Sequence, residues 1–171
     1  MILFLDASAL VKLYLEESGS SAMRDMFEAR RFSGRFYISD YVGLEVFVRL
    51  HKHKRSASRQ GRRAFQHGLR QFETHRARNF NVLALERHLL LDAEVLATRF
   101  TDSGAGTLDL IHLASAFQVQ RNVPDEKLVF VAADRKLRHV AQRAGFRTFD
   151  PEQERPEDLA RISDNAWSTG G

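Results

Sequence analysis

The chain has 171 residues, of which 43% are apolar and 28% charged, the composition of an ordinary single globular domain. Its formal net charge is +4, and it contains no cysteine, which excludes disulfides and thiolate zinc sites. No apolar run approaches the roughly 20 residues that cross a bilayer, and the N-terminal run is too short for a signal peptide, so we expect a cytoplasmic protein with no membrane contact.

The first half of the chain alternates short apolar runs with amphipathic stretches. Residues 2–6 are typical of a buried parallel strand, and Ser8 is placed to cap a helix over residues 9–15. We expect further helices over residues 18–30, 41–53 and 59–78, a second strand at residues 36–39, and a break at residues 56–58.

The second half continues this alternation. Strands are expected at residues 80–85, 128–132 and 146–149, and helices at 86–100, 107–120 and 135–144, with Thr107 as a cap. Strands that alternate with helices predict an α/β protein, a three-layer α/β/α sandwich around a central parallel sheet of four or five strands. We assign residues 1–149 to this domain and residues 150–171 to an acidic C-terminal tail.

The positive charge is concentrated in one segment. Residues 52–78 carry nine Lys or Arg residues and one acidic residue, whereas residues 150–171 carry six acidic residues and two arginines. A dense basic surface attracts polyanions, so the segment is a candidate for contact with nucleic acid. A solvated helix face is the alternative interpretation.

Two acidic residues directly follow apolar runs. Asp6 comes after MILFL, and Asp134 comes after LVFVAA. In a parallel sheet such residues lie at the carboxyl ends of strands, where neighbouring strands bring them together. A single acidic residue in this position is also explained by a structural role, as the end of a strand or the cap of a helix. Two such residues in one chain make a purely structural role for both a weaker explanation.

Two more acidic residues, Glu45 and Asp109, lie in helical segments that can face the same point. The alternative explanation for Glu45 is an ion pair with Arg49 one helical turn away, and that for Asp109 is its favourable position near the positive end of the helix dipole. We expect His112 to be structural. Four carboxylates around one point repel each other unless a cation holds them, and an all-carboxylate set suits Mg²⁺ or Mn²⁺. The sequence therefore predicts a divalent-metal site, with a nuclease as the natural function.

Four stretches in order carry a family resemblance: FLDASALVKLY from residue 4, SDYVGLE from 39, TLDLIHLASA from 107 and FVAADRKL from 130. With them the chain resembles PIN-domain proteins of the VapC-like toxin type. The resemblance implies a metal-dependent endoribonuclease that cleaves RNA, a cognate antitoxin and a homodimer. It maps the four acids of the site onto Asp6, Glu45, Asp109 and Asp134, and we expect Asp6 and Asp109 to be the main metal ligands.

One position departs from that family pattern. Related sequences often carry Thr or Ser two residues before the last acid, where this chain has Ala132. The departure mildly favours an alternative function, a catalytically weak or silent PIN-fold protein that acts through RNA or protein contacts, whereas the retention of all four acids argues against it. A phosphatase of the haloacid-dehalogenase type is a further alternative, but it needs a second Asp where this chain has Ser8.

Overall fold

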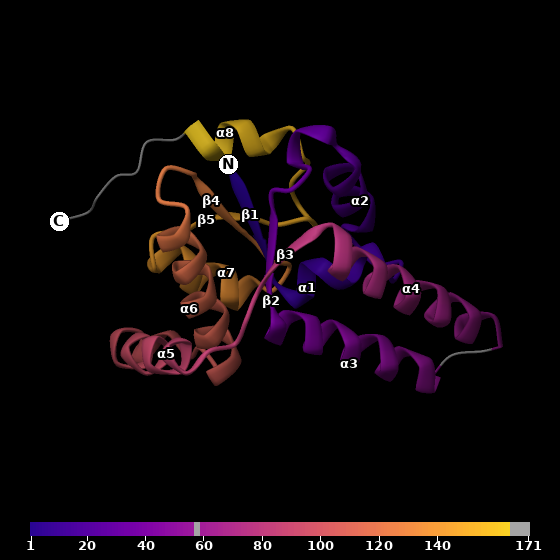
Figure 1. The fold of residues 1–171 in the computed structure, drawn as a ribbon, viewed down its shortest axis with the longest axis horizontal. Helices are drawn as coiled ribbons and strands as arrows, with labels where there is room; N and C mark the ends of the chain where they lie inside the picture. Colours follow the sequence, from indigo (N-terminus) through magenta and orange to yellow (C-terminus); the bar gives the residue numbers. More distant parts are fainter. Residues whose placement is uncertain (57–58, 165–171) are drawn as a thin grey trace.

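The structure is a computed structural model that describes residues 1–56 and 59–164. Five parallel strands form one sheet in the order β3-β2-β1-β4-β5. The strands are β1 (Ile2–Leu5), β2 (Phe36–Ser39), β3 (Phe80–Leu83), β4 (Leu128–Val131) and β5 (Arg147–Phe149). The predicted three-layer α/β/α sandwich with a central parallel sheet is confirmed (Figure 1).

Both faces of this sheet are apolar, because the central strands β1 and β4 are buried along their whole length. Successive side chains of a strand point to opposite faces. Leu3 and Leu5 therefore join one hydrophobic cluster, and Ile2 and Phe4 join the other. Two apolar faces need two layers of helices.

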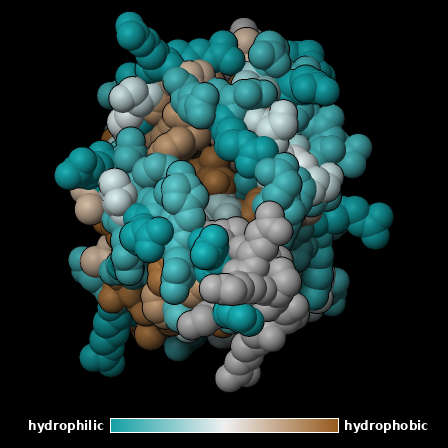
Figure 2. Space-filling model, turned by 90° about the vertical axis from the view of Figure 1, so that its right-hand side faces the viewer, coloured by the Kyte–Doolittle hydropathy of each residue, from teal (hydrophilic) through white to brown (hydrophobic). Residues whose placement is uncertain are grey.

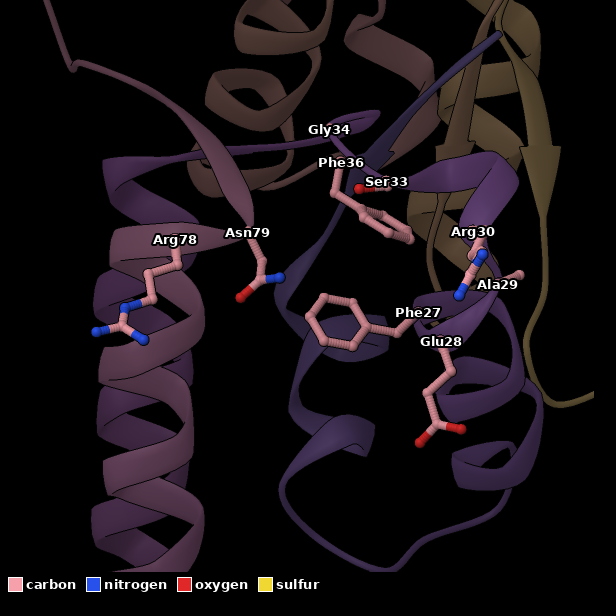
Figure 3. Close-up of a pocket in the computed structure, with 9 residues that line it drawn as sticks. All are labelled: Phe27, Glu28, Ala29, Arg30, Ser33, Gly34, Phe36, Arg78 and Asn79. Carbon is pink, nitrogen blue, oxygen red and sulfur yellow. The ribbon is translucent and has the colours of Figure 1, made fainter.

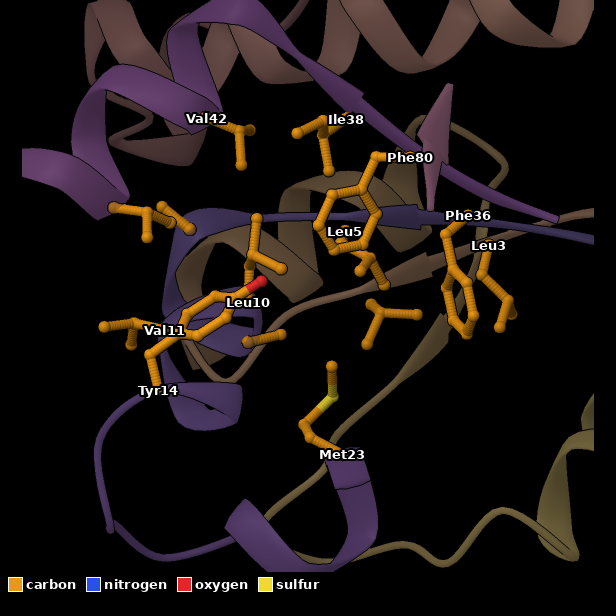
Figure 4. Packing of buried hydrophobic residues seen from close by; sticks show 14 of the residues in the cluster. Leu3, Leu5, Leu10, Val11, Tyr14, Met23, Phe36, Ile38, Val42 and Phe80 are labelled. Atoms are coloured by element: carbon orange, nitrogen blue, oxygen red, sulfur yellow. The ribbon is translucent and has the colours of Figure 1, made fainter. Parts of the chain in front are cut away.

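Helices from both ends of the chain cover the first face, and their side chains surround residues such as Leu5, Leu10 and Ile38 (Figure 4). They are α1 (Ala7–Leu10) with η1 (Val11–Leu13), α2 (Ser20–Glu28), α3 (Asp40–Ser56), α4 (Arg59–Arg78) and α8 (Asp158–Asp164). A short 3-10 turn, η2 (Arg30–Phe32), precedes β2. Helices α3 and α4 form a hairpin that extends from the body of the molecule (Figure 1); we call it the arm.

The second face is covered by α5 (Arg87–Arg99), α6 (Thr107–Asn122) and α7 (Arg135–Arg143), with η3 (Thr101–Ser103) between α5 and α6. Helix α6 is buried over most of its circumference, as its apolar sequence predicts. Within the described ranges, no helix has an apolar stretch long enough to span a lipid bilayer.

The structure corrects two local predictions. The cap of the first helix is Asp6 rather than Ser8, and α6 is capped by Gly106 rather than Thr107. The acidic tail contains the helix α8, which buries Leu159. Of the break expected at residues 56–58, residues 57 and 58 lie outside the described part of the chain. The boundary at residue 149 stays a prediction.

Candidate metal centre

Asp6 lies at the carboxyl end of the central strand and is the N-cap of α1. Its Oδ2 accepts hydrogen bonds from the backbone amide of Ser8 at 2.8 Å and from the Ser8 hydroxyl at 2.6 Å. The residue is only 4% exposed. A carboxylate buried this deeply needs polar partners on both of its oxygens, because burial without them is costly.

Glu45 of α3 and His112 of α6 meet Asp6 at this edge of the sheet. His112 Nε2 is placed to donate to Glu45 Oε2 at 2.7 Å, and it lies 3.5 Å from Asp6 Oδ1. One ligand atom from each of the three residues lies within 4.8 Å of the other two. The side chain of Glu45 is 24% exposed and that of His112 only 2%, so the cluster opens to solvent beside Glu45.

The protonation of His112 reflects this environment. Burial by itself would lower the pKa of the ring, because it disfavours the charged form. The hydrogen bond to Glu45 and the negative charges of Asp6, Glu45 and Asp109 outweigh burial and hold the pKa of His112 above its ordinary value of 6.5. The pocket is thus strongly negative, and it favours a positive charge at its centre.

The donor set fits a small divalent cation. Mg²⁺ holds its ligands at about 2.1 Å, so ligand atoms around one ion lie about 3–4 Å apart. The three candidate atoms, which lie within 4.8 Å of one another, are near this spacing. Two carboxylates supply the hard ligands that Mg²⁺ and Mn²⁺ prefer, and the imidazole shifts the preference toward a transition metal such as Mn²⁺.

The other two acids of the sequence prediction lie outside this three-residue cluster. Asp134 is exposed and caps α7, where its Oδ1 accepts from the amides of Lys136 and Leu137 at 2.8 and 3.0 Å. Asp109 lies in the first turn of α6, and its Oδ2 accepts from the backbone amide of Gly106, the N-cap residue, at 2.8 Å. Each of them keeps a second oxygen free of hydrogen bonds to the described residues.

Ser8 connects the Asp6 and Asp134 segments. Besides donating to Asp6, its Oγ accepts from the backbone amides of Ala133 and Asp134 at 2.9 and 3.2 Å. The ends of β1 and β4 are therefore joined through one hydroxyl. Ala132, where a hydroxyl is missing from the family pattern, is completely buried in the hydrophobic cluster of the second face.

Sequence reasoning placed His112 on the same helical face as Asp109 and interpreted it as structural; its contacts with Glu45 and Asp6 were not predicted. The available signal is its position three residues after Asp109, about one helical turn away in a helix that is otherwise apolar. The pair that the sequence suggested for Glu45, with Arg49, is not among the ion pairs of the described residues; His112 is its partner instead. The assignment of the four acids as ligands stays a prediction.

Comparison with known proteins identifies the family and similar folds. Residues 3–143 match the family model of the PIN domain. The fold is similar to that of PAE2754 from Pyrobaculum aerophilum, with a TM-score of 0.59 and 21% identity over 95% of both chains. It is also similar to Mycobacterium tuberculosis VapC20, a toxin that cleaves the sarcin–ricin loop, with a TM-score of 0.59 and 16% identity over 84% of this chain and 95% of that one. No curated protein matches the chain in sequence.

Proposed function

The chain belongs to the PIN-domain family, and from this premise we propose that it is a metal-dependent endoribonuclease, the toxin of a toxin–antitoxin pair. PIN domains are typically metal-dependent nucleases. The observation that carries the proposal is the buried cluster of Asp6, Glu45 and His112 at the carboxyl end of the central strand. In parallel α/β sheets this edge is where ligands bind.

Mg²⁺ or Mn²⁺ is the proposed cofactor, held by Asp6 and Glu45 with His112 beside them. Such a cation lowers the pKa of a bound water and stabilises charge on the scissile phosphate. Asp134 and Asp109 lie outside the cluster, each with an oxygen available to position a water or accept its proton. The sequence expectation that Asp109 is a main ligand stays a proposal, and the cluster supports Glu45 as a further ligand beside Asp6.

RNA is the proposed substrate, and the arm is its proposed contact surface. Exposed arginines such as Arg63 and Arg70 lie on α4, and Figure 2 shows a mostly hydrophilic surface on the side where the arm ends. Part of the predicted basic segment, the side chains of residues 53–61 and 64, lies outside the described residues. Arginines along a groove or arm bind the phosphates of RNA without reading its sequence.

We also propose a cytoplasmic location, a cognate antitoxin protein and a homodimer. The structural likeness to a toxin and the family membership support the antitoxin. A cationic segment of such a partner would neutralise Asp6 and Glu45 and so compete with the metal.

RNA cleavage tests the proposed function. Three reactions on a structured RNA are compared: the wild-type protein with Mg²⁺ or Mn²⁺, the wild-type protein with excess EDTA, and the Asp6→Asn variant with the metal. We expect cleavage in the first case alone. Equal cleavage in all three excludes the metal-dependent mechanism.

A melting experiment separates the proposal from a silent PIN-fold protein. A protein that binds metal at the cluster gains thermal stability with Mn²⁺ by mass action. An unchanged melting temperature, together with tight RNA binding, supports the silent alternative.

A further inference from the structure

The turn between β4 and α7 is held from two sides. On one side, the amides of Ala133 and Asp134 donate to Ser8 Oγ at 2.9 and 3.2 Å. On the other side, Nη1 of Arg138 donates to the carbonyl oxygens of Ala132 and Ala133 at 2.9 and 2.7 Å. Two side chains thus bind the peptide groups that lead into Asp134.

Arg138 is itself anchored. Its side chain is 15% exposed, and Nη2 lies 2.5 Å from Oδ2 of Asp150, a residue that is 8% exposed. The second oxygen of Asp150 accepts from the Glu152 amide at 3.0 Å. The planar guanidinium reaches the two carbonyls with Nη1 and the carboxylate with Nη2, whereas a lysine ammonium would have to serve all three acceptors from a single nitrogen on a flexible stem.

We propose that Arg138 is a positioning residue for the metal centre, an inference that rests on the proposed function. It acts through the turn, because the peptides that it holds present their amides to Ser8, and Ser8 in turn holds Asp6 Oδ2. Without Arg138, two carbonyls and a largely buried carboxylate lose their donor. The turn then relaxes, Ser8 loses its aligned amides, and Asp6 loses its fixed orientation.

Lys12 provides a matched control. It is 3% exposed, and its ammonium lies 2.7 Å from Glu152 and 3.4 Å from Glu17. It therefore anchors the same segment after β5 through an ion pair in which the lysine is buried and Glu152 is partly exposed. Among the described residues, Lys12 makes no ion pair or hydrogen bond to the turn, so the Lys12→Met variant loses stability without losing the path from Arg138 to Asp6.

The experiment compares wild type, Arg138→Met, Arg138→Lys and Lys12→Met by Mn²⁺ titration calorimetry and by amide hydrogen exchange of the metal-free protein. We expect Arg138→Met to raise the Kd for Mn²⁺ about tenfold, the usual scale for residues that orient ligands, and Arg138→Lys about threefold. Exchange at Ala133 and Asp134 should accelerate in the Arg138 variants alone. Lys12→Met should melt at a lower temperature with a wild-type Kd.

A double-mutant cycle with Ser8→Ala tests the path. In the Ser8→Ala background, Arg138→Met should change the Kd by less than about threefold, because the connection to Asp6 is already broken. A full tenfold rise of the Kd for Mn²⁺ on adding Arg138→Met to the Ser8→Ala variant would contradict the proposed path from Arg138 through Ser8 to Asp6.

The outcomes separate the two proposals. A wild-type Kd and wild-type exchange in Arg138→Met, or in Arg138→Lys if the methionine variant does not fold, overturn the inference alone. A wild-type protein that binds no Mn²⁺ overturns the proposed function and this inference together.

Discussion

The two ends of the same sheet use polar residues in opposite ways. At the carboxyl end, Asp6, Ser8 and His112 are nearly inaccessible to solvent and bonded to one another or to backbone. At the amino end, a shallow pocket of about 200 Å³ lies beside the starts of β2 and β3 (Figure 3). Its polar residues, among them Arg30, Arg78 and Asn79, are exposed.

Under the proposed function, this difference favours the carboxyl end of the sheet as the place of the chemistry. Burying polar groups costs free energy that their hydrogen bonds only partly recover, so a chain tolerates such a cluster where it has a use. Exposed polar residues around a hollow carry no such cost. The cavity at the amino end is therefore weaker evidence for function than the compact cluster at the carboxyl end.

The largest contrast is expected from removing one carboxylate charge at each end. Glu45→Gln should slow metal-dependent RNA cleavage at least about 100-fold, because it removes a candidate ligand, and ligand-supporting residues alone account for up to that factor. Glu28→Gln makes the same chemical change in the amino-end pocket and should leave the rate within about twofold. Rates are measured with saturating Mn²⁺. Similar losses in both variants would remove the distinction between the two ends.

Charge reversal should separate the ends in RNA binding. Replacing Arg63 and Arg70 on the arm with Glu should weaken RNA binding. The slope of log K against the logarithm of the salt concentration should become shallower by about 0.7 for each RNA phosphate that the arm no longer neutralises. The same reversal at Arg30, which lines the amino-end pocket and lies outside the arm, should leave the slope near the wild-type value. Binding of the Asp6→Asn protein to a single-stranded RNA is measured between low and high salt. A wild-type slope in the arm variant as well would show that the arm is only a solvated face.

A third contrast concerns two histidines. His112 has its pKa raised by acidic neighbours, whereas burial lowers the pKa of His75, which stacks with Phe27 near the amino-end pocket. NMR titration of the metal-free protein should therefore place the two pKa values on opposite sides of 6.5. Glu45→Gln should lower the pKa of His112 and leave that of His75 unchanged.

The two histidines should also affect stability with opposite sign. Protonated His112 contributes stability below pH 6.5, and this contribution is lost as the pH rises through its higher folded-state pKa. Neutral His75 contributes stability above pH 6.5, and this is lost as the pH falls. Melting of His112→Gln and His75→Gln against wild type across this range measures both. A parallel pH dependence in the two variants would contradict the assignment.

The sequence predicts the fold well because the signals are local. The central strands β1 and β4 are short apolar runs, and each of Asp6 and Asp134 is visible as the first acid after such a run. The pairing of Glu45 with His112 could not be predicted, because it joins residues 67 positions apart on different layers of helices. The contacts of Ser8 and Arg138 with the turn depend in the same way on tertiary packing.

The sequence also predicted the wrong helix cap where two neighbouring residues could each serve as the N-cap of the first helix. Both Asp6 and Ser8 are good helix caps; the earlier residue caps, so the hydroxyl of Ser8 is left to bond Asp6 and the turn. For the segment after residue 149 the sequence predicts only an acidic tail, and the structure adds the helix α8, whose Leu159 packs against the core of the first face.

The smallest effect is expected from the amino-end pocket itself. Asn79→Ala removes an exposed side-chain amide that makes no hydrogen bond to the described residues. The melting temperature, the Mn²⁺ affinity and the rate of RNA cleavage should therefore all stay close to the wild-type values, as for most surface substitutions. The pocket has aromatic rings and arginines around it, which are also the groups that bind nucleotides. A loss of RNA affinity above about fivefold in Asn79→Ala would mean that this end binds substrate as well. Burial of polar groups would then identify where the chemistry happens, but not where the substrate is held.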